Sequence, residues 1–385
     1  MKPSMEFTKV MPRGLVPVTD IDVRELAEIY DETDTYLSIY LPTASRDQES
    51  MNETYMNSRT RAVKKALVGK VASDLKMTFD LVGEHISHKP IPGEKGRIIF
   101  ASAPVNFLHV YRIGVEPERK LVLDTSPFLL PLARLRDDYE DYALLLMDSQ
   151  QAKLFTVRSN VMNVEDSNSI DLMNRHKKGG MSQMRFNRLR RGAISAFISE
   201  VIEDIEELEG LEETRGIVLA GPGEAKKQLH ESLPQHLREQ VIGIEDISMD
   251  TPLGNLLDLG ERVAEKDERG KEQALVEELR SSIMKGEPAA YGAQKVRTAL
   301  KNGRVSVLLL LDKTSIPGWI CERCQSITER TVKPKRCPNC GGPTSVVDVV
   351  EEIYELAERT GARTEFVKDA PFLESIGGIG AVLRY

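Results

Sequence analysis

Four cysteines constrain the fold of this chain more than any other feature of its sequence. Cys321 and Cys324 form one Cys-x-x-Cys pair, Cys337 and Cys340 form a second, and twelve residues separate the two pairs. A two-residue spacer lets both thiolates of a turn face one metal ion, and two such turns supply the four sulfurs of a tetrahedral site. The sequence therefore predicts one structural Zn²⁺ in a small ribbon over residues 317–345.

The same four cysteines leave two alternatives open, a pair of disulfides or an iron–sulfur cluster. The chain has no other cysteine, which is typical of cytosolic proteins, where scattered disulfides are rare. Four protein thiolates leave no coordination position for water, so we do not expect Lewis-acid catalysis at this site. The expected role of the metal is to hold together a module that is too small to build its own core.

The size and charge of the chain limit the classes of protein it can belong to. Its 385 residues, of which 41% are apolar and 29% are charged, predict two or three globular domains. The net charge of −8 means that contact with nucleic acid requires a local basic patch. The sequence lacks a long apolar run and the apolar core of a signal peptide, so we expect no membrane partner and a cytoplasmic location.

Helical patterns alternate with apolar strands along the chain, which predicts an α/β (α+β) fold of mixed sheets packed with helices. We expect three domains with boundaries at 1–137, 138–250 and 251–385. The stretch from 159 to 180 is polar, and we expect it to contribute no core element. The main expected helices cover 20–32, 53–88, 185–207 and 251–280, and the expected strands include 35–43, 96–113, 141–157, 215–221 and 305–311.

Residues 175–191 form a basic segment in an otherwise acidic chain. The segment contains no acid, and Gly179 and Gly180 lie within it, where the backbone can approach a surface closely. Arginine and lysine neutralise phosphates, so the segment is suited to a nucleic-acid backbone, with a solvated basic loop as the open alternative. Its seven cations are Arg175, Lys177, Lys178, Arg185, Arg188, Arg190 and Arg191.

The basic segment is not one of the common phosphate-binding loops. It lacks the Gly-x-x-x-x-Gly-Lys spacing, and it does not follow an apolar strand as a dinucleotide fingerprint does. We interpret His176 within it as one more cation rather than as a general base.

These residues resemble a known family. Gly179-Gly180-Met181-Ser182, followed by MRFNRLRR, resembles the Gly-Gly-Gln-Ser loop and arginine-rich helix of archaeal and eukaryotic class-1 peptide chain release factors. RGIVLAGPGEAKKQL is similar to the next part of that middle domain, and AYGAQKVRTALKNGRVSVLLLLD is similar to the third domain, which Pelota-type factors share. Archaeal members carry a four-cysteine ribbon in the third domain, and GGIGAVLRY resembles their C-terminus. The resemblance covers about residues 140–385.

The resemblance implies a role for the glycine tip at the peptidyl-transferase centre of the ribosome. There the family's glutamine helps to place water and to stabilise the oxyanion that develops on the peptidyl ester. Gly179 and Gly180 match the glycines, but Met181 occupies the glutamine position, and Gln183 follows two residues later. The backbone N–H of Met181 remains a donor, whereas its side chain cannot orient water. We therefore expect peptidyl-tRNA ester hydrolysis to be compromised.

The first 137 residues match the family poorly. Members that read stop codons carry Asn-Ile-Lys-Ser and Tyr-x-Cys-x-x-x-Phe elements, and the nearest stretch here is TYMNSRTRAVKKAL, without a proper match. No cysteine lies outside the ribbon, so the second element is absent. This domain, on the decoding side of the ribosome by resemblance, is not expected to read stop codons. Its cations Arg59, Arg61, Lys64 and Lys65 are candidates for RNA contact or for a solvated helix face.

Three functions follow from these observations. The first is a ribosome-binding translation factor that enters the A site independently of stop codons, in hibernation or in rescue and quality control. The second is an active release factor or peptidyl-tRNA hydrolase, and the third is an RNA- or protein-binding module that has left the ribosome. By resemblance, the partners are ribosomal RNA, P-site tRNA and a translational GTPase related to elongation factors Tu and 1-alpha.

Overall fold

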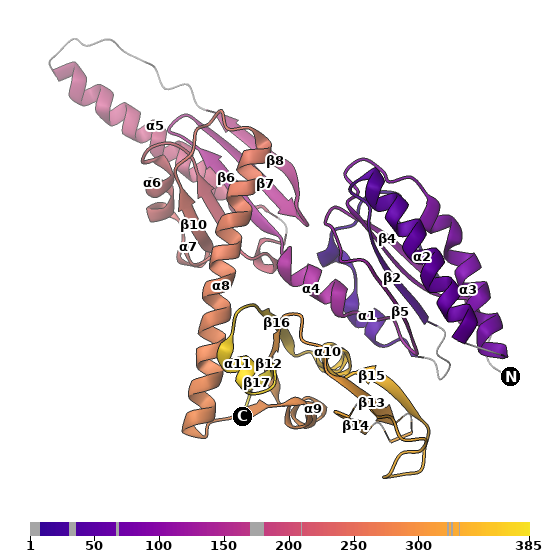
Figure 1. The fold of residues 1–385 in the computed structure, drawn as a ribbon. Helices are drawn as coiled ribbons and strands as arrows, with labels where there is room; N and C mark the ends of the chain where they lie inside the picture. Colours follow the sequence, from indigo (N-terminus) through magenta and orange to yellow (C-terminus); the bar gives the residue numbers. More distant parts are fainter. Residues whose placement is uncertain are drawn as a thin grey trace. The chain divides into compact units, whose positions relative to one another are not determined.

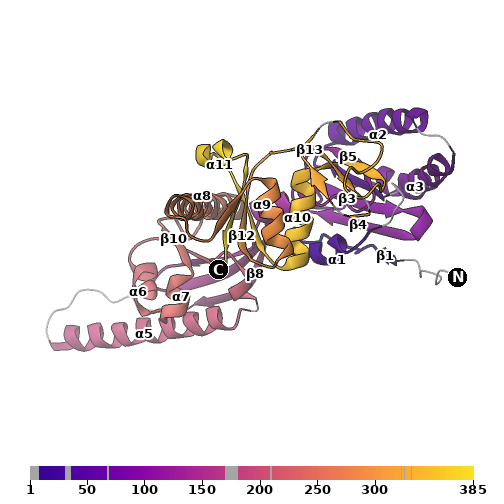
Figure 2. The same cartoon turned by 90° about the horizontal axis from the view of Figure 1, so that it is seen from below.

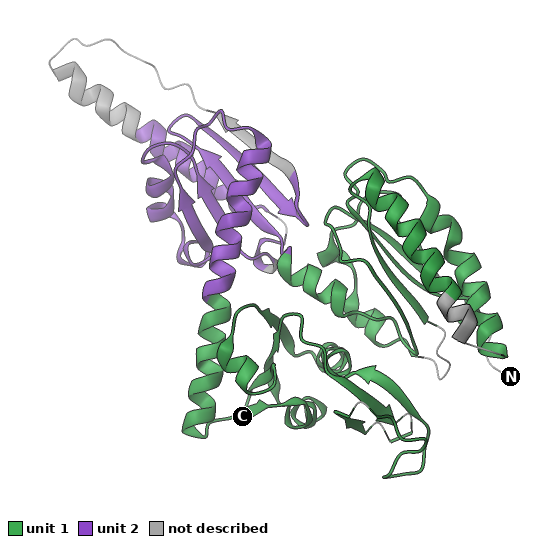
Figure 3. Ribbon diagram, in the orientation of Figure 1, with its two compact units in different colours: residues 1–138, 271–385 green, residues 139–270 purple. Residues whose placement is uncertain are grey.

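The computed structural model describes residues 8–30, 36–66, 69–169, 181–208, 210–321, 323–324, 326–330 and 332–385. The expected α/β class is confirmed, because helices pack on several mixed sheets (Figure 1). The chain divides into two compact units, residues 1–138 with 271–385, and residues 139–270 (Figure 3). The three-domain boundaries stay a prediction. Within the described residues, no helix combines the length and the apolar character needed to cross a bilayer.

The N-terminal part of unit 1 is a five-stranded sheet in the order β1-β4-β3-β2-β5. β1 runs parallel to β4, and the other neighbouring strands are antiparallel. One apolar face of the sheet packs against Met56 of α2 and against Phe79 and Val82 of α3. The elements are β1 (Thr8–Val10), η1 (Val18–Asp20), α1 (Val23–Ala27), β2 (Tyr36–Pro42), α2 (Arg46–Ala66), α3 (Lys70–Ser87), β3 (Gly96–Ser102), η2 (Ala103–Val105), β4 (Phe107–Ile113), β5 (Lys120–Asp124) and α4 (Leu130–Asp138).

Two expected helices of this part differ from the structure. The helical spacing expected over 53–88 belongs to two helices, because α2 and α3 are separate and Gly69 precedes α3 with φ 76° and ψ −147°, a non-helical conformation. Glycine adopts such a positive φ without the Cβ clash that other residues meet. The helix expected over 20–32 is shorter in the structure: Asp22 caps α1 by accepting a hydrogen bond from the Glu25 N–H at 2.8 Å.

The C-terminal part of unit 1 is a four-stranded sheet in the order β11-β17-β12-β16, with only β12 and β16 parallel. Glycines end two helices of this part, since Gly303 follows α9 with φ 64° and Gly361 caps α10 with φ 65°. The elements are β11 (Ala289–Tyr291), α9 (Ala293–Lys301), β12 (Val305–Leu311), α10 (Val349–Thr360), β16 (Arg363–Val367), α11 (Pro371–Ser375) and β17 (Ile379–Leu383), with β13 (Pro317–Cys321), β14 (Ile327–Thr328) and β15 (Thr344–Asp348) in the ribbon.

Helix α10 carries two buried carboxylates that join the two parts of unit 1. Glu351 accepts hydrogen bonds from the N–H groups of Leu129 and Leu130, at 2.5 and 2.9 Å, where α4 begins. Glu355 accepts a hydrogen bond from the Ser126 hydroxyl at 3.1 Å. Burial raises the pKa of Glu355 to about 7. Burial and the neighbouring Glu355 carboxylate also raise the pKa of Glu351. This contact therefore holds carboxyl groups that resist ionisation.

Unit 2 is built on a five-stranded sheet in the order β10-β9-β6-β7-β8. β10, β9 and β6 are parallel, while β7 and β8 extend the sheet antiparallel. Helix α8 begins in this unit and continues beyond residue 270. The elements are β6 (Tyr142–Met147), β7 (Gln151–Arg158), β8 (Val161–Ser169), α5 (Met181–Glu206), η3 (Leu211–Glu213), β9 (Ile217–Ala220), α6 (Ala225–Ser232), α7 (Gln235–Glu239), β10 (Val241–Glu245) and α8 (Leu253–Lys285).

The sheet of unit 2 has an apolar core on each face. Successive residues of a strand point to opposite faces. Leu145 and Leu219 therefore face α5, α6 and α7, whereas Leu144 and Val218 face α8. Figure 2 shows α5, α6 and α7 on one side of the sheet and α8 on the other. Helix α5 is fixed to its face by Phe197, Ile198, Val201 and Ile205.

The expectation that residues 159–180 contribute no core element is partly wrong. Residues Val161–Ser169 form β8, which pairs antiparallel with β7 at the edge of the sheet. Because an edge strand is paired along one side only, backbone hydrogen bonds to β7 can hold it despite its polar composition. Residues 170–180 lie outside the described part of the chain.

Candidate functional site

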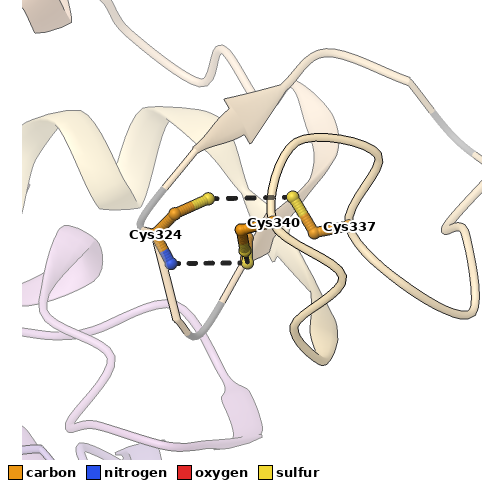
Figure 4. A group of neighbouring side chains, drawn as sticks. Cys324, Cys337 and Cys340 are labelled. Carbon is orange, nitrogen blue, oxygen red and sulfur yellow. Dashed lines mark hydrogen bonds between the residues drawn. The ribbon is translucent and has the colours of Figure 1, made fainter.

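The four predicted metal ligands come together in unit 1. Their sulfurs all lie within 4.8 Å of one another. The Cys321 and Cys340 sulfurs are 3.4 Å apart, and those of Cys324 and Cys337 are 3.7 Å apart. Figure 4 shows Cys324 and Cys337 facing each other with Cys340 beside them. Four sulfurs around Zn²⁺ at about 2.3 Å would be separated by about 3.8 Å, so this cluster could hold one metal ion.

The fold of the ribbon explains how the cysteines meet. β13 pairs with β14 and with β15 and ends at Cys321. The backbone N–H of Cys324 donates to the Cys321 sulfur at 3.5 Å, and that of Asn339 donates to the Cys337 sulfur at 3.4 Å. A Cβ at Gly342 would lie 3.3 Å from both the Cys321 and Cys340 sulfurs. Glycine at this position therefore leaves room for the sulfur cluster.

The chemistry of the cluster favours metal over disulfides. All four cysteines are free, and the 3.4 and 3.7 Å separations far exceed the disulfide bond length of about 2.05 Å. Hydrogen bonds from the hydroxyl and backbone N–H of Ser326 lower the pKa of the Cys324 thiol to about 6. A lower pKa favours the thiolate, which is the form that binds metal.

The predicted basic helix is α5 of unit 2, and it starts earlier than expected. Its first residue is Met181 rather than Arg185, and it runs to Glu206. Met181 and Gln183 therefore both belong to the first helical turn, about 200° apart around the axis. Arg185, Arg188, Arg190 and Arg191 follow on the next turns of the backbone.

Part of the predicted tip lies outside the described residues. This applies to Gly179 and Gly180 and to the cations Arg175, Lys177 and Lys178, as well as to His176. Their proposed roles stay predictions. In the N-terminal part of unit 1, Arg59 and Arg61 are exposed on α2, and the Arg59 guanidinium lies 5.4 Å from the centre of the Tyr55 ring.

Lys226 is a buried cation that the sequence patterns did not single out. Its ammonium donates hydrogen bonds to the carbonyls of Gly221 and Gly223 at 2.7 and 2.8 Å, and to the Asp246 carboxylate at 2.5 Å. It closes the turn between β9 and α6, on the face of the sheet where α5 packs. In the sequence, Lys226 is marked only by its place after the Gly-Pro-Gly turn. That place does not predict burial, because lysine side chains usually point to solvent.

Comparisons with known proteins show which families this chain resembles. Residues 127–265 match the family model described as bacterial archaeo-eukaryotic release factor family 10, and residues 270–385 match eRF1 domain 3. Peptide chain release factor subunit 1 of Archaeoglobus fulgidus is 28% identical over 336 residues, which are 80% of this chain and 82% of that protein. Over these two stretches, and over most of its length, the chain is similar to archaeal and eukaryotic class-1 release factors.

The similarity to family members extends into the N-terminal part. Peptide chain release factor subunit 1 of Thermococcus kodakarensis is 26% identical over 408 aligned positions, which cover 94% of this chain and 96% of that protein. That alignment includes most of the first 137 residues, so the similarity to this family reaches beyond the expected limit of about residue 140. Among solved structures, Saccharomyces cerevisiae Dom34 aligns with 75% of this chain and 80% of its own at 13% identity and a TM-score of 0.42.

Proposed function

We propose that this chain is a ribosome-binding translation factor that enters the A site without reading a stop codon. It acts in ribosome hibernation or in rescue and quality control. The observation that carries the proposal is the acid-free basic segment that leads into α5, with Gly179 and Gly180 in the order of release factors but Met181 in the place of glutamine. The relatives named peptide chain release factor subunit 1 support the ribosome as the target.

The charge arrangement of α5 supports an anionic partner. The N-terminal end of a helix carries a partial positive charge and free N–H groups, and both attract phosphate. Arg185, Arg188, Arg190 and Arg191 all lie in the N-terminal half of the helix, the reverse of the charge order that complements a helix dipole. The acids of the helix begin at Glu200, in its other half. This distribution does not favour the isolated helix, whereas it favours binding to a phosphate backbone.

Sedimentation with 70S ribosomes through a sucrose cushion tests the proposal. The protein should pellet with ribosomes at moderate salt. If about five of the seven cations meet phosphates, log affinity should fall with log salt at a slope of roughly −3.5 to −4.5. Replacing the four arginines of α5 (Arg185, Arg188, Arg190 and Arg191) by glutamine should strongly weaken pelleting and flatten the salt slope by about 2.8 to 3.6. The matched control replaces four exposed cations elsewhere in unit 2, Lys227, Arg262, Lys266 and Arg269, and should pellet normally. Equal pelleting of both variants would reject the proposed surface.

The alternative is an active release factor or peptidyl-tRNA hydrolase, and the preserved Gly179-Gly180 pair favours it. Gln183 is the nearest glutamine, but it lies about 200° around the axis of α5 from Met181. The alternative predicts release of labelled peptide from ribosomes, lost in Gly180→Ala and in Gln183→Ala. Our proposal predicts little release by the natural chain and a gain in Met181→Gln.

The metal and the protein partner complete the proposal. Cysteine thiolates at these separations suit Zn²⁺, which as one structural ion would stabilise the ribbon without taking part in catalysis. The metal content of the purified protein tests this assignment, with one zinc per chain expected.

By family resemblance, a translational GTPase of the elongation factor Tu or 1-alpha type would deliver the chain. Gel filtration of the pair with a non-hydrolysable GTP analogue should then show a complex that is absent with GDP.

A further inference from the structure

The cysteine ribbon carries a second concentration of positive charge. Four cations lie between β14 and Cys337, and a fifth lies in the first cysteine turn. All five are exposed: Arg323, Arg330, Lys333, Lys335 and Arg336. Glu329 is the one exposed acid among the described residues of this ribbon. The local excess of cations contrasts with the net charge of −8 for the chain.

These five cations do not serve ion pairs within the described part of the chain. Elsewhere in unit 1, exposed or half-buried cations do form such pairs, as Lys368 does with Asp138 at 2.5 Å and Arg134 with Asp312 at 3.3 Å. Like charges that gather on one small module repel each other, so they lower its stability unless a partner neutralises them. Binding of an external anion would therefore relieve this repulsion and stabilise the ribbon.

Helix α9 also brings two cations toward the cysteine cluster. Arg297 and Lys301 lie close enough to the Cys324 thiol for an electrostatic interaction with it. Four thiolates around a divalent cation would carry a net charge of about −2, so these two side chains are suited to balance a metal centre.

The chemistry of the exposed surface favours RNA over a protein partner. Protein interfaces are usually anchored by aromatic or large aliphatic side chains that become buried. The large exposed apolar residues of the described ribbon are Val332 and Val346, and its tryptophan, Trp319, is 4% exposed. Exposed arginine and lysine without an exposed aromatic anchor are the groups that contact phosphate oxygens.

The backbone that carries these cations is held in place. The Thr344 hydroxyl donates a hydrogen bond to the Pro334 carbonyl at 2.5 Å, which ties the middle of the cationic stretch to β15. The proline ring also fixes the φ angle of that residue. Lys333 and Lys335, on either side of it, therefore lose less backbone entropy when they bind.

We propose that the ribbon binds the phosphate backbone of RNA through Arg323, Arg330, Lys333, Lys335 and Arg336. This contact is separate from the α5 tip and goes beyond the function proposed for that tip. It holds whether or not the tip enters the peptidyl-transferase centre. The metal has an indirect part, because it fixes the turns from which the cations project.

Fluorescence anisotropy with a labelled ribosomal RNA hairpin tests this contact on the full-length, zinc-loaded chain. The variant Lys333→Glu, Lys335→Glu, Arg336→Glu should bind at least about tenfold more weakly, and its log affinity should depend on log salt less steeply by about 2 to 2.7. The matched control reverses three exposed lysines, Lys89, Lys266 and Lys285, with the same change in net charge, and should bind within about twofold of the natural chain.

Further controls decide between loss of the RNA contact and loss of the fold. Zinc content and circular dichroism of the variant establish that the ribbon is folded, and a Gln version of the triple variant separates lost attraction from added repulsion. Replacing the four α5 arginines by glutamine should leave the ribbon's part of the salt slope in place, so failure of the tip and failure of the ribbon give different results. A folded triple variant with unchanged affinity and slope would overturn the proposal, as would binding of polyglutamate as tight as that of RNA.

Discussion

The buried cluster of the cysteine ribbon consists of Trp319, Cys321 and Cys337, whereas the sheet of unit 2 is covered by apolar side chains on both faces. The ribbon therefore depends on its four sulfurs, while the middle unit depends on burial of apolar surface. In the ribbon the five cations are exposed and lie outside this buried cluster. The comparison teaches that a metal-dependent module can devote its surface to charge, whereas the described part of unit 2 is organised around an apolar core.

Removal of the metal should have the largest effect, and it should be confined to the ribbon. Structural zinc contributes on the order of 10 kcal/mol to the folding of small metal modules, and the core of the ribbon is too small to replace that contribution. Cys337→Ser, or chelation of the natural chain, should abolish hydrogen-exchange protection in β13 to β15 while unit 2 keeps its protection. Cooperative loss of protection in both regions would contradict the separation.

Loss of the Lys226 ammonium should have the next largest effect, in unit 2. Lys226→Met leaves the Gly221 and Gly223 carbonyls without this donor, and Lys226 is 1% exposed. We expect the free energy of unfolding of unit 2 to fall by about 2 to 3 kcal/mol in denaturant titrations. The control is Lys227→Met, since Lys227 is exposed, and it should change stability by less than about 0.5 kcal/mol. Equal effects of the two variants would show that burial of this ammonium is not the cause.

The buried acids of α10 should give a smaller effect that depends on pH. Burial raises the pKa of Glu355 to about 7 in the folded chain, above its ordinary value of 4.5. Between these values the folded state keeps the proton and the unfolded state has lost it, so stability falls as pH rises through this window and stays lower above it. Glu355→Gln should remove the part of the dependence that Glu355 contributes, leaving the part that comes from Glu351, and should stabilise unit 1 by on the order of 2 kcal/mol at about pH 8, with little change at about pH 4.5.

Glu374 supplies the control for this measurement, because it is exposed in the same unit. Denaturant titrations of Glu374→Gln at several pH values should follow those of the natural chain. An unchanged pH dependence in Glu355→Gln would show that Glu355 is not its source and would leave Glu351 as the group to test next.

The arginines of α5 should give the smallest effect on stability. Replacing Arg185, Arg188, Arg190 and Arg191 by glutamine relieves their unfavourable position near the N-terminal end of the helix. Thermal unfolding of this variant should shift by no more than the equivalent of about 0.5 kcal/mol, in either direction. A clear destabilisation would assign these cations to the structure of unit 2 rather than to binding.

Much of the fold could be predicted because local patterns decide it. Gly303 and Gly361 end their helices in this way, since glycine adopts positive φ at little cost. The break at Gly69 was missed, because apolar spacing continues across it and only the backbone conformation reveals two helices. Strand β8 was missed for a different reason: its support comes from β7, and composition does not record such pairing.

The sequence by itself identified the candidate metal ligands, the basic segment and the family resemblance, because Cys-x-x-Cys spacing, local charge and motif order are properties of the chain alone. Only the tertiary structure decided which groups become buried. It placed Lys226 inside a turn of unit 2 and Glu351 against the start of α4, through contacts between residues far apart in the sequence. Desolvation depends on the atoms that surround a group, so no local pattern could have predicted either position.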